Sequence, residues 1–355
     1  MELSKAIFVK GTPYEQGVGQ ARQAGKTILQ NILRVRELME QNRFDMDAYR
    51  AFIQKDAEYI EKTNPELIEE MHGIADGLAI DFQEVLYLNI PAYFMKEHFR
   101  QECSMLLVKG RATLDGKTYL IKNRDMSCYL EQLLISREYP DGMRIVEVNG
   151  AGTVTYPAMG INQYGVAVTN TGFWSPKAPT DYDRVGEAQV VINSHIILRR
   201  CKTAREGLDW LLTTPRINGL NMMIADRKDA FLIEVLKDGA YVEEADERGV
   251  LMRTNHYVSE QNRGLNTDPK DTPSTFFRYE RLREAVEKYH GRFRFQDLYR
   301  IMSDHKDAPN CLCRHPQEGA PGWTASSTLC VVDDLELWST IGSPCEMLPH
   351  AGIEP

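Results

Sequence analysis

Apolar residues recur with helical spacing through the first hundred residues of the chain. Thr12 followed by Pro13 is typical of a helix start, because a threonine side chain accepts hydrogen bonds from the first free amides and proline suits the first turn. The pair Asn64 and Pro65 repeats this signal ahead of a second amphipathic run. The pattern predicts an almost entirely helical segment over residues 1–102.

From Cys103 onward the spacing changes to short apolar runs that are typical of strands. Runs at 104–108 and 118–122 flank Asp115 and Gly116, a dipeptide that strongly favours a two-residue hairpin turn. This change of pattern indicates a boundary at about residue 102.

Most later strand-like runs follow one another directly, and helical patterns interrupt them only at 188–213 and between 276 and 303. Parallel strands need long crossovers, so direct succession favours antiparallel sheets covered by helices. We therefore predict an α+β chain with a helical segment over 1–102 and a sheet-containing body over 103–355.

The predicted hairpin brings several polar side chains to one place. With a two-residue turn, Cys103 lies opposite Cys128 and only three positions from Asp125, and a bulge shifts this pairing by one or two residues. In either case Asn123, Arg124 and Asp125 return to the neighbourhood of Cys103. A thiol, an amide, a guanidinium and a carboxylate suit a polar catalytic site. Each also has an ordinary interpretation, such as a buried cysteine or a turn-capping aspartate.

The composition is that of an ordinary globular chain with ample core. Of its 355 residues, 43% are hydrophobic and 26% are charged, and interspersed acidic and basic residues give a net charge of -9. No lysine- and arginine-rich stripe is present, so nucleic acid is not an expected partner. The first residues lack a secretory signal, and no apolar stretch reaches the roughly 18–20 residues that span a bilayer. We expect a cytoplasmic protein with no membrane partner, and the pattern leaves its oligomeric state open.

The seven cysteines are odd in number and sparse, which argues against a disulfide scaffold. Cys311 and Cys313 form a C-x-C pair with His305 and His315 close by. Structural zinc sites usually have C-x(2–4)-C spacing and a second matching pair, and no second pair follows here. The sequence therefore favours thiols in a folded loop, and it predicts no metal and no cofactor.

Eight stretches along the chain, taken in order, resemble one family. It is the autoproteolytic acyltransferases related to penicillin (isopenicillin N) acyltransferase, among the N-terminal-nucleophile hydrolases that also include the bile-salt hydrolases. The stretches are GTPYEQGVGQ (11–20), ECSMLL (102–107), KNRD (122–125), GINQYGVAVTNTG (160–172), RTNHY (253–257), STFFRYERL (274–282), SDHKDAPNCLCRHP (303–316) and TASSTLCVVDD (324–334).

The resemblance implies a fold of two stacked antiparallel sheets between helical layers. Residues 1–102 match a pro-segment that becomes the small subunit after cleavage between Glu102 and Cys103, and residues 103–355 match the catalytic body. By position in the motifs, Cys103 matches the nucleophile, Asp125 an aspartate that binds the new α-amino group, Asn170 an oxyanion-hole asparagine, Asn255 an asparagine that orients amine and oxyanion, and Arg278 an arginine supporting the nucleophile.

Two positions depart from the family pattern. Glu102 precedes the nucleophile where glycine is frequent, and a bulky charged residue there is expected to slow self-cleavage. Lys122 stands where bile-salt hydrolases usually carry an arginine. Aromatic residues on either side of the motifs, Tyr93, Phe173 and Trp174, are candidates to line an acyl pocket.

The resemblance implies a self-cleaving amidohydrolase that acts through an acyl-thioester on Cys103. Its expected partners are a small acylated amine, amino acid or peptide as substrate, and the cleaved pro-segment as a subunit. Three alternatives stay open: transfer of the acyl group to an amine, a papain-like thiol enzyme using His256 without self-cleavage, and an unprocessed, inactive binding protein.

Overall fold

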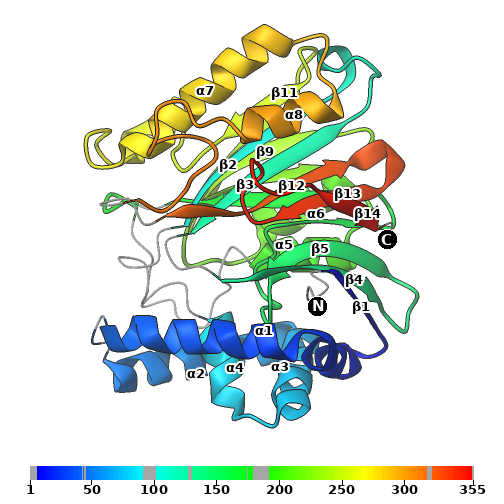
Figure 1. Ribbon diagram of the computed structural model, residues 1–355, viewed down its shortest axis with the longest axis vertical. Helices are drawn as coiled ribbons and strands as arrows, with labels where there is room; N and C mark the ends of the chain where they lie inside the picture. Colours follow the sequence, from blue (N-terminus) through cyan, green and yellow to red (C-terminus); the bar gives the residue numbers. More distant parts are fainter. Residues whose placement is uncertain are drawn as a thin grey trace.

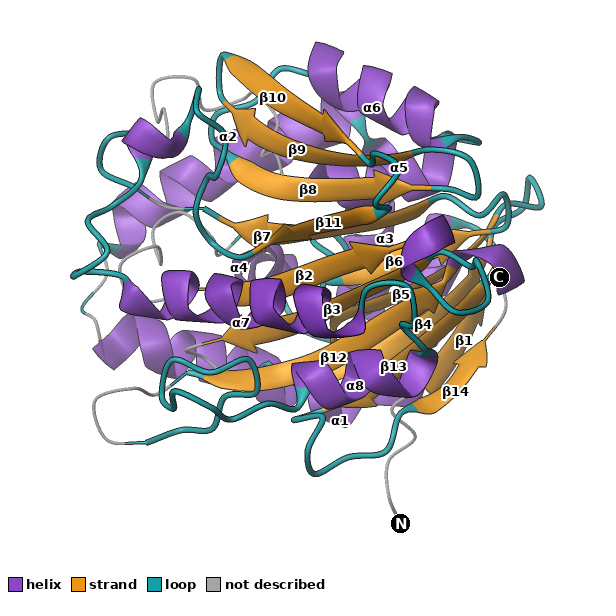
Figure 2. Cartoon of the chain, turned by 90° about the horizontal axis from the view of Figure 1, so that it is seen from above, coloured by secondary structure: helices purple, strands orange, loops and turns teal. Residues whose placement is uncertain are grey.

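The structure is a computed structural model of the chain. It describes residues 6–41, 43, 45–90, 101–126, 130–173, 175–178, 192–317 and 322–353. In these residues two β-sheets stack face to face and helices cover both outer faces (Figure 1, Figure 2). This is the α+β sandwich expected from the sequence.

The larger sheet has eight strands within the described residues, in the order β1-β4-β5-β6-β7-β8-β9-β10. All its neighbours pair antiparallel except β1 and β4, which are parallel. Its strands are β1 (Ala6–Lys10), β4 (Gln132–Glu138), β5 (Arg144–Gly150), β6 (Met159–Asn162), β7 (Ala167–Gly172), β8 (Leu220–Ala225), β9 (Ala230–Leu236) and β10 (Gly239–Glu244).

The smaller sheet has six antiparallel strands within the described residues, in the order β11-β2-β3-β12-β13-β14. Apolar side chains from both sheets, such as Met105, Leu120 and Met223, form the core between them. Its strands are β2 (Gln101–Val108), β3 (Tyr119–Met126), β11 (Val250–Arg253), β12 (Trp323–Val331), β13 (Glu336–Ile341) and β14 (His350–Ile353).

Helices α7 and α8 pack on the smaller sheet, whereas α1–α6 pack on the larger one. Helices α1–α4 form the lower layer in Figure 1. The helices are α1 (Pro13–Gln41), α2 (Met46–Thr63), α3 (Pro65–Leu78), α4 (Phe82–Asn89), α5 (Asn193–Arg200), α6 (Ala204–Thr213), α7 (Pro273–Tyr289) and α8 (Phe295–Met302). The helix starts predicted at Pro13 and Pro65 are confirmed.

Helices α1 and α3 cross at very short range. A Cβ atom on Gly17 would lie 2.1 Å from the backbone oxygen of Glu70, and one on Gly73 would lie 2.1 Å from that of Tyr14. No side chain fits at either position. The close helix crossing therefore explains why Gly17, in the first motif GTPYEQGVGQ, is a glycine.

A buried ion-pair network joins this helical layer to the larger sheet. Arg137 on β4 pairs with Glu70 on α3 at 2.6 Å and with Glu147 on β5 at 2.8 Å, and all three side chains are almost inaccessible. His195 on α5 contacts the other oxygen of Glu147 at 3.0 Å. Burial of these charges is tolerated because each has an opposite partner, so the layer is held to the sheet by more than apolar packing.

The prediction of an almost entirely helical first segment is wrong at its start, because Ala6–Lys10 forms the edge strand β1. Ile7 and Val9 are buried whereas Phe8 is 52% exposed, which is the alternation of a strand with one covered face. Five residues are too few for the period to stand out beside the long helix that follows. The predicted boundary at residue 102 falls inside β2.

The predicted two-residue hairpin is also wrong. Strands β2 and β3 are joined by residues 109–118, which contain a short 3₁₀ turn before Asp115 and Gly116. Leu114 instead donates its amide to the Phe293 carbonyl at 3.0 Å, so the connection is pulled toward a distant segment. The pairing therefore shifts by four residues, and Cys103 lies opposite Arg124. Cys128 lies outside the described residues.

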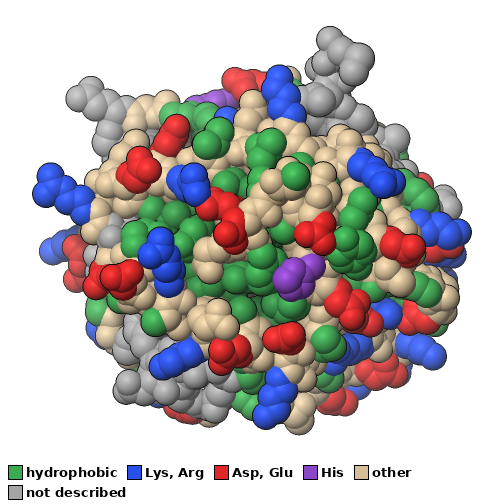
Figure 3. All heavy atoms as spheres, turned by 90° about the horizontal axis from the view of Figure 1, so that it is seen from below, with side chains coloured by type: hydrophobic (Ala, Val, Ile, Leu, Met, Phe, Trp, Pro, Cys, Tyr) green, Lys and Arg blue, Asp and Glu red, His purple; other side chains and the backbone are tan. Residues whose placement is uncertain are grey.

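Figure 3 shows the face formed by helices α1–α4, where acidic and basic side chains are interspersed with apolar ones. Among the described residues, no helix combines the length and apolar character needed to cross a membrane.

Candidate active site

Cys103 lies on β2 and is 1% exposed. Its backbone amide donates to Asn255 Oδ1 at 2.8 Å, and its carbonyl accepts a hydrogen bond from Arg278 Nη1. The next strand brings Arg124 opposite it and Asn123 opposite Ser104. The prediction that residues 123–125 return beside Cys103 is confirmed, although the register that led to it is not.

Asn255 connects the two sheets at this point. It follows β11, and its Nδ2 donates to the carbonyl of Gly172, at the end of β7, at 2.7 Å. Its Oδ1 accepts from Arg278 Nη2 at 2.8 Å as well as from the Cys103 amide. One amide side chain thus fixes the backbone of the candidate nucleophile relative to the larger sheet.

Arg278 projects from α7 and is fully buried. Its Nη1 also donates to Ser104 Oγ at 2.9 Å, and its Nε donates to Ser274 Oγ at 3.1 Å. A guanidinium presents its donors in a fixed planar fork, so these contacts hold Cys103 from the carbonyl side.

The carboxylate of Glu102 is bound rather than left in an apolar site. Ser274 Oγ donates to its Oε2 at 2.8 Å, Arg314 forms an ion pair with the same oxygen, and Arg278 Nη2 lies 3.5 Å away. The side chain is 25% exposed. The residue expected to hinder cleavage is therefore matched by positive charge on both sides.

Asp125 lies between Glu102 and Thr324 across three adjacent strands. Its Oδ1 accepts from Thr324 Oγ1 at 2.7 Å, whereas its Oδ2 is buried and has no hydrogen-bond partner among the described residues. Burial raises the pKa of Asp125 to about 6, although Arg278 and Arg314 oppose the shift. Oδ2 of this carboxylate can therefore accept a further hydrogen bond.

Lys122 is fully buried on β3 and donates to the Ala158 carbonyl at 3.2 Å. Burial lowers the pKa of Lys122 to about 8, and the nearby side chain of Cys103 opposes this shift. A lysine whose pKa lies near neutral pH can accept a proton from a neighbouring thiol or return one to it.

Asn170 lies on β7, which packs against β2 of the other sheet. Its Nδ2 donates to Ser194 Oγ at 3.0 Å and reaches the Pro157 carbonyl at 3.4 Å. Its donors therefore already have acceptors in the uncut chain. The oxyanion role of Asn170 stays a prediction.

Of the three aromatic pocket candidates, Phe173 follows β7 directly and stacks on Tyr257 with the ring centroids 3.8 Å apart. Tyr93 and Trp174 lie outside the described residues. The acyl pocket stays a prediction.

His256 is 6% exposed and lies in a structural setting. Its Nδ1 lies 2.9 Å from Thr275 Oγ1, and its ring stacks on Phe276 at 4.3 Å. Burial, with the charges of Arg253 and Arg278, lowers the pKa of His256 to about 3. A ring so engaged is a poor base at neutral pH, which disfavours the papain-like alternative.

Sequence reasoning missed three side chains that contact Glu102 or Asp125, namely Ser274, Arg314 and Thr324. Each belongs to a motif that carried the resemblance, which was the available signal. Their convergence on Glu102 and Asp125 follows only from the fold, because the contacts join positions 172–212 residues apart.

The sandwich holds a buried thiol between an asparagine and an arginine, and this arrangement fits the acyl-transferring class of enzymes to which the family comparison assigns the chain. The chain belongs to the family described as acyl-coenzyme A:6-aminopenicillanic acid acyl-transferase, whose model matches residues 112–333. The matched range contains Asp125, Asn170, Asn255 and Arg278, and it begins after Cys103. No curated protein gives a significant match to the sequence.

Solved structures of similar shape are remote in sequence. A mutant of conjugated bile acid hydrolase from Clostridium perfringens is 13% identical, with a TM-score of 0.44 over 67% of this chain and 89% of that one. A second variant of that hydrolase is 15% identical, with a TM-score of 0.45 over 67% of this chain and 89% of that one. Penicillin V acylase from Agrobacterium tumefaciens is 11% identical, with a TM-score of 0.40 over 67% of this chain and 83% of that one.

Proposed function

We propose that the chain is a self-cleaving cysteine amidohydrolase that breaks the bond after Glu102 and then uses Cys103 on linear amides. The observation that carries this proposal is the double clamp on the junction. Asn255 and Arg278 hold the backbone of Cys103, while Ser274 and Arg314 hold the side chain of Glu102. Such fixed geometry is what an intramolecular attack requires.

The first reaction is an N-to-S acyl shift. Lys122 in its neutral form takes the thiol proton, and the sulfur bonds to the carbonyl carbon of Glu102. The bond to the nitrogen of Cys103 then breaks, and that nitrogen takes the proton back. Water hydrolyses the resulting thioester and leaves a new carboxylate on Glu102 and a free thiol. Lys122 is the candidate shuttle because the α-amine does not exist before cleavage.

The product places a free α-amine on Cys103, whose intrinsic pKa of about 7.7–8.0 lets it exchange protons with the thiol. Asp125 Oδ2 has no hydrogen-bond partner within the part of the chain that the structure describes, which supports its role as the group that receives this amine. An ammonium next to Asp125 would restore the charged form of the carboxylate, because a neighbouring opposite charge lowers a carboxyl pKa.

In the second reaction the thiol of Cys103 attacks a substrate amide and forms an acyl-thioester, which releases the amine. Water then regenerates the enzyme. Cys103 is 1% exposed in the uncut chain, so the site must open before a substrate reaches the sulfur. Cleavage provides that freedom, because it releases the chain end at Glu102.

The released segment is expected to remain as a subunit. The network of Arg137 with Glu70 and Glu147 supports this, since separation would leave charges unpaired. The backbone hydrogen bonds between β1 and β4 also hold the released segment to the body.

The experiment is intact mass spectrometry of the wild type beside Cys103→Ala, with Cys103→Ser as a conservative variant, after incubation at neutral pH. Fragments spanning 1–102 and 103–355 in the wild type, and a single uncut mass in Cys103→Ala, are expected. One uncut mass in both contradicts self-processing. Thiol labelling then separates an intact but reactive enzyme from an inactive binding protein.

Acyl transfer to an amine is the second candidate function, favoured by the family description. Processed enzyme is incubated with an N-acyl substrate from a panel that includes penicillins and acyl-amino acids, with or without an added amine such as 6-aminopenicillanic acid. An acylated amine formed at the expense of the free acid indicates transfer, whereas free acid alone indicates hydrolysis.

A further inference from the structure

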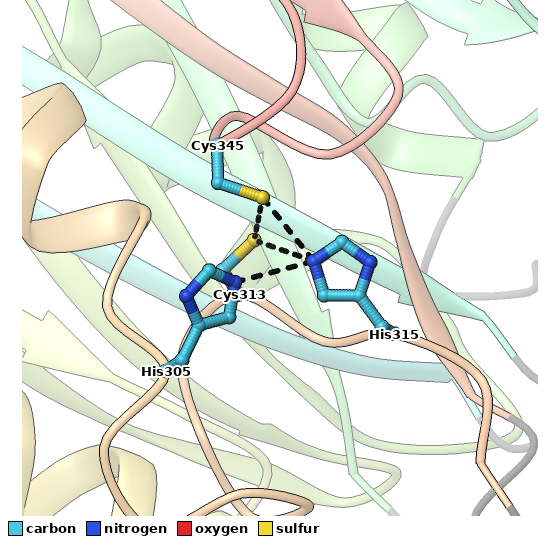
Figure 4. A group of neighbouring side chains, drawn as sticks. All are labelled: His305, Cys313, His315 and Cys345. Atoms are coloured by element: carbon cyan, nitrogen blue, oxygen red, sulfur yellow. Dashed lines mark hydrogen bonds between the residues drawn. The ribbon is translucent and has the colours of Figure 1, made fainter.

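Four potential metal ligands converge at the end of the molecule formed by the loop after α8 and the loop between β13 and β14. They are His305, Cys313, His315 and Cys345 (Figure 4), and their ligand atoms all lie within 4.8 Å of one another. The sequence did not indicate a site because Cys345 is 30 residues from His315. Strands β12 and β13 form a hairpin between them and bring the two loops together.

Four of the six distances between these atoms are close to those of a tetrahedral set, and the other two are no longer than 4.8 Å. His315 Nε2 lies 3.2 Å from His305 Nε2, 3.2 Å from Cys345 Sγ and 3.8 Å from Cys313 Sγ, and the two sulfurs are 3.5 Å apart. Zinc bonds of about 2.0–2.3 Å place tetrahedral ligands roughly 3.3–3.8 Å apart. Both thiols are free, so a disulfide does not hold the sulfurs together.

The surroundings also suit a ligating histidine. His315 directs Nε2 toward the sulfurs, and its other nitrogen, Nδ1, lies 3.7 Å from Glu346 Oε1. A carboxylate behind the ring is the usual partner of a metal-bound histidine, because it fixes the tautomer that leaves the ligating nitrogen unprotonated. Cys311, the other cysteine of the C-x-C pair, instead donates to the Cys313 carbonyl.

We propose that His305, Cys313, His315 and Cys345 bind one zinc ion that has a structural role. Four protein ligands close the coordination sphere, which is the pattern of structural rather than catalytic zinc. Two thiolates and two imidazoles balance the ion's charge and prefer zinc over magnesium or calcium. His305 and Cys345 are exposed, so the ion can enter from solvent.

The site has a direct connection to the cleavage junction. Arg314 lies between two of the ligands and holds the carboxylate of Glu102. Its backbone amide donates to Thr324 Oγ1 at 2.9 Å, and the same hydroxyl donates to Asp125 at 2.7 Å. A metal bound at Cys313 and His315 therefore fixes the segment that presents both the guanidinium and the hydroxyl.

The test uses the full chain with Cys103→Ala, so that the candidate nucleophile contributes no thiolate and no cleavage occurs. Zinc is removed with a chelator under reducing conditions, and the protein is titrated with Co²⁺. We expect one ion per chain, with thiolate-to-cobalt charge-transfer absorption and the intense visible bands of tetrahedral cobalt. Added Zn²⁺ should displace it, and metal analysis of the untreated protein should find zinc.

Two double variants locate the ion. Cys313→Ser with Cys345→Ser, and His305→Ala with His315→Ala, should each abolish the charge-transfer band or weaken Co²⁺ binding at least ten-fold.

Cys201→Ser with His72→Ala is the matched control, because it removes a thiol and an imidazole outside the cluster, and it should bind as the parent does. Circular dichroism checks that every variant is folded. If the cysteine pair is not, the histidine pair provides the safer variant, because His305 is exposed and His315 is half-buried. Absence of binding by the reduced parent, or equal binding by folded variants, overturns the proposal. A Cys313–Cys345 disulfide in protein that takes up no metal after reduction overturns it as well.

Discussion

The buried carboxylate of Asp125 makes the uncut chain sensitive to pH in a predictable direction. Burial raises its pKa from 3.8 in the unfolded chain to about 6 in the folded one. The folded state therefore favours the protonated form. This stabilisation is fully present below pH 3.8 and is lost as the pH rises through about 6.

The magnitude follows from the shift. A difference of about two pKa units corresponds to about 3 kcal/mol, because each unit is 1.36 kcal/mol. Replacing Asp125 by asparagine removes the ionisation and keeps the shape. In a Cys103→Ala chain, Asp125→Asn should change the free energy of unfolding little at pH 4 and raise it by about 3 kcal/mol at pH 7.5.

Urea unfolding of both proteins at the two pH values gives these free energies by linear extrapolation. Asp209→Asn, at an exposed position in the middle of α6, is the matched control and should show no such pH dependence. The reasoning would be refuted if Asp125→Asn changed the free energy of unfolding by the same amount at both pH values. Such a result would show that ionising the buried carboxylate does not destabilise the fold.

Three further predictions concern the junction and the helical layer. Lys122→Met should slow self-cleavage about 10²–10⁴-fold, the range for loss of a general base, in a time course of fragment formation in which exposed Lys270→Met changes nothing. Arg314→Gln should slow cleavage about 10- to 150-fold, because a hydrogen bond to a charged group contributes about 1.5–3 kcal/mol. Adding Glu102→Gln should recover most of the rate, and an additive double variant would contradict the ion-pair explanation. Arg137→Met removes the cation that two buried glutamates share and should lower the unfolding free energy of the uncut chain by about 3–5 kcal/mol, measured by urea unfolding. A change below about 1 kcal/mol would contradict a shared charge network.

The parts of this fold that the sequence predicts are those with strong local signals. Proline-initiated helices at Pro13 and Pro65, and continuous apolar strands such as β9, leave patterns that neighbouring residues alone determine. The edge strand β1 is not predicted, because its short alternation is stabilised by pairing with β4, which is distant in the sequence. The predicted register of β2 and β3 is wrong for the same reason, since a contact with the distant Phe293, rather than the turn residues themselves, holds the loop between these strands.

The candidate site shows the same division at the level of chemistry. Motif order predicts five site residues, and three of them, Cys103, Asn255 and Arg278, contact one another in the fold. The other two are Asp125 and Asn170. The expectation that Glu102 slows self-cleavage stays a prediction, because it concerns a rate. The structure adds a partner for the charge of Glu102, Arg314, which lies 212 residues away in the chain and leaves no local signal in the sequence.

That loop is where the two proposals meet. Residues 303–316 supply three of the four potential zinc ligands, and between the last two lies Arg314, which pairs with Glu102. The side chain of Arg314 is long and loses conformational entropy when it is held in one place. A metal that joins this loop to the β13–β14 loop would restrict the backbone at the position where the guanidinium is needed. The two functions are separable all the same: the zinc site is tested in a chain that cannot cleave, and cleavage is tested by the mass of its fragments. If the ion binds and its removal slows cleavage as much as Arg314→Gln does, the metal acts through that arginine. If removal slows cleavage equally in the Arg314→Gln chain, the metal stabilises the sheet edge instead.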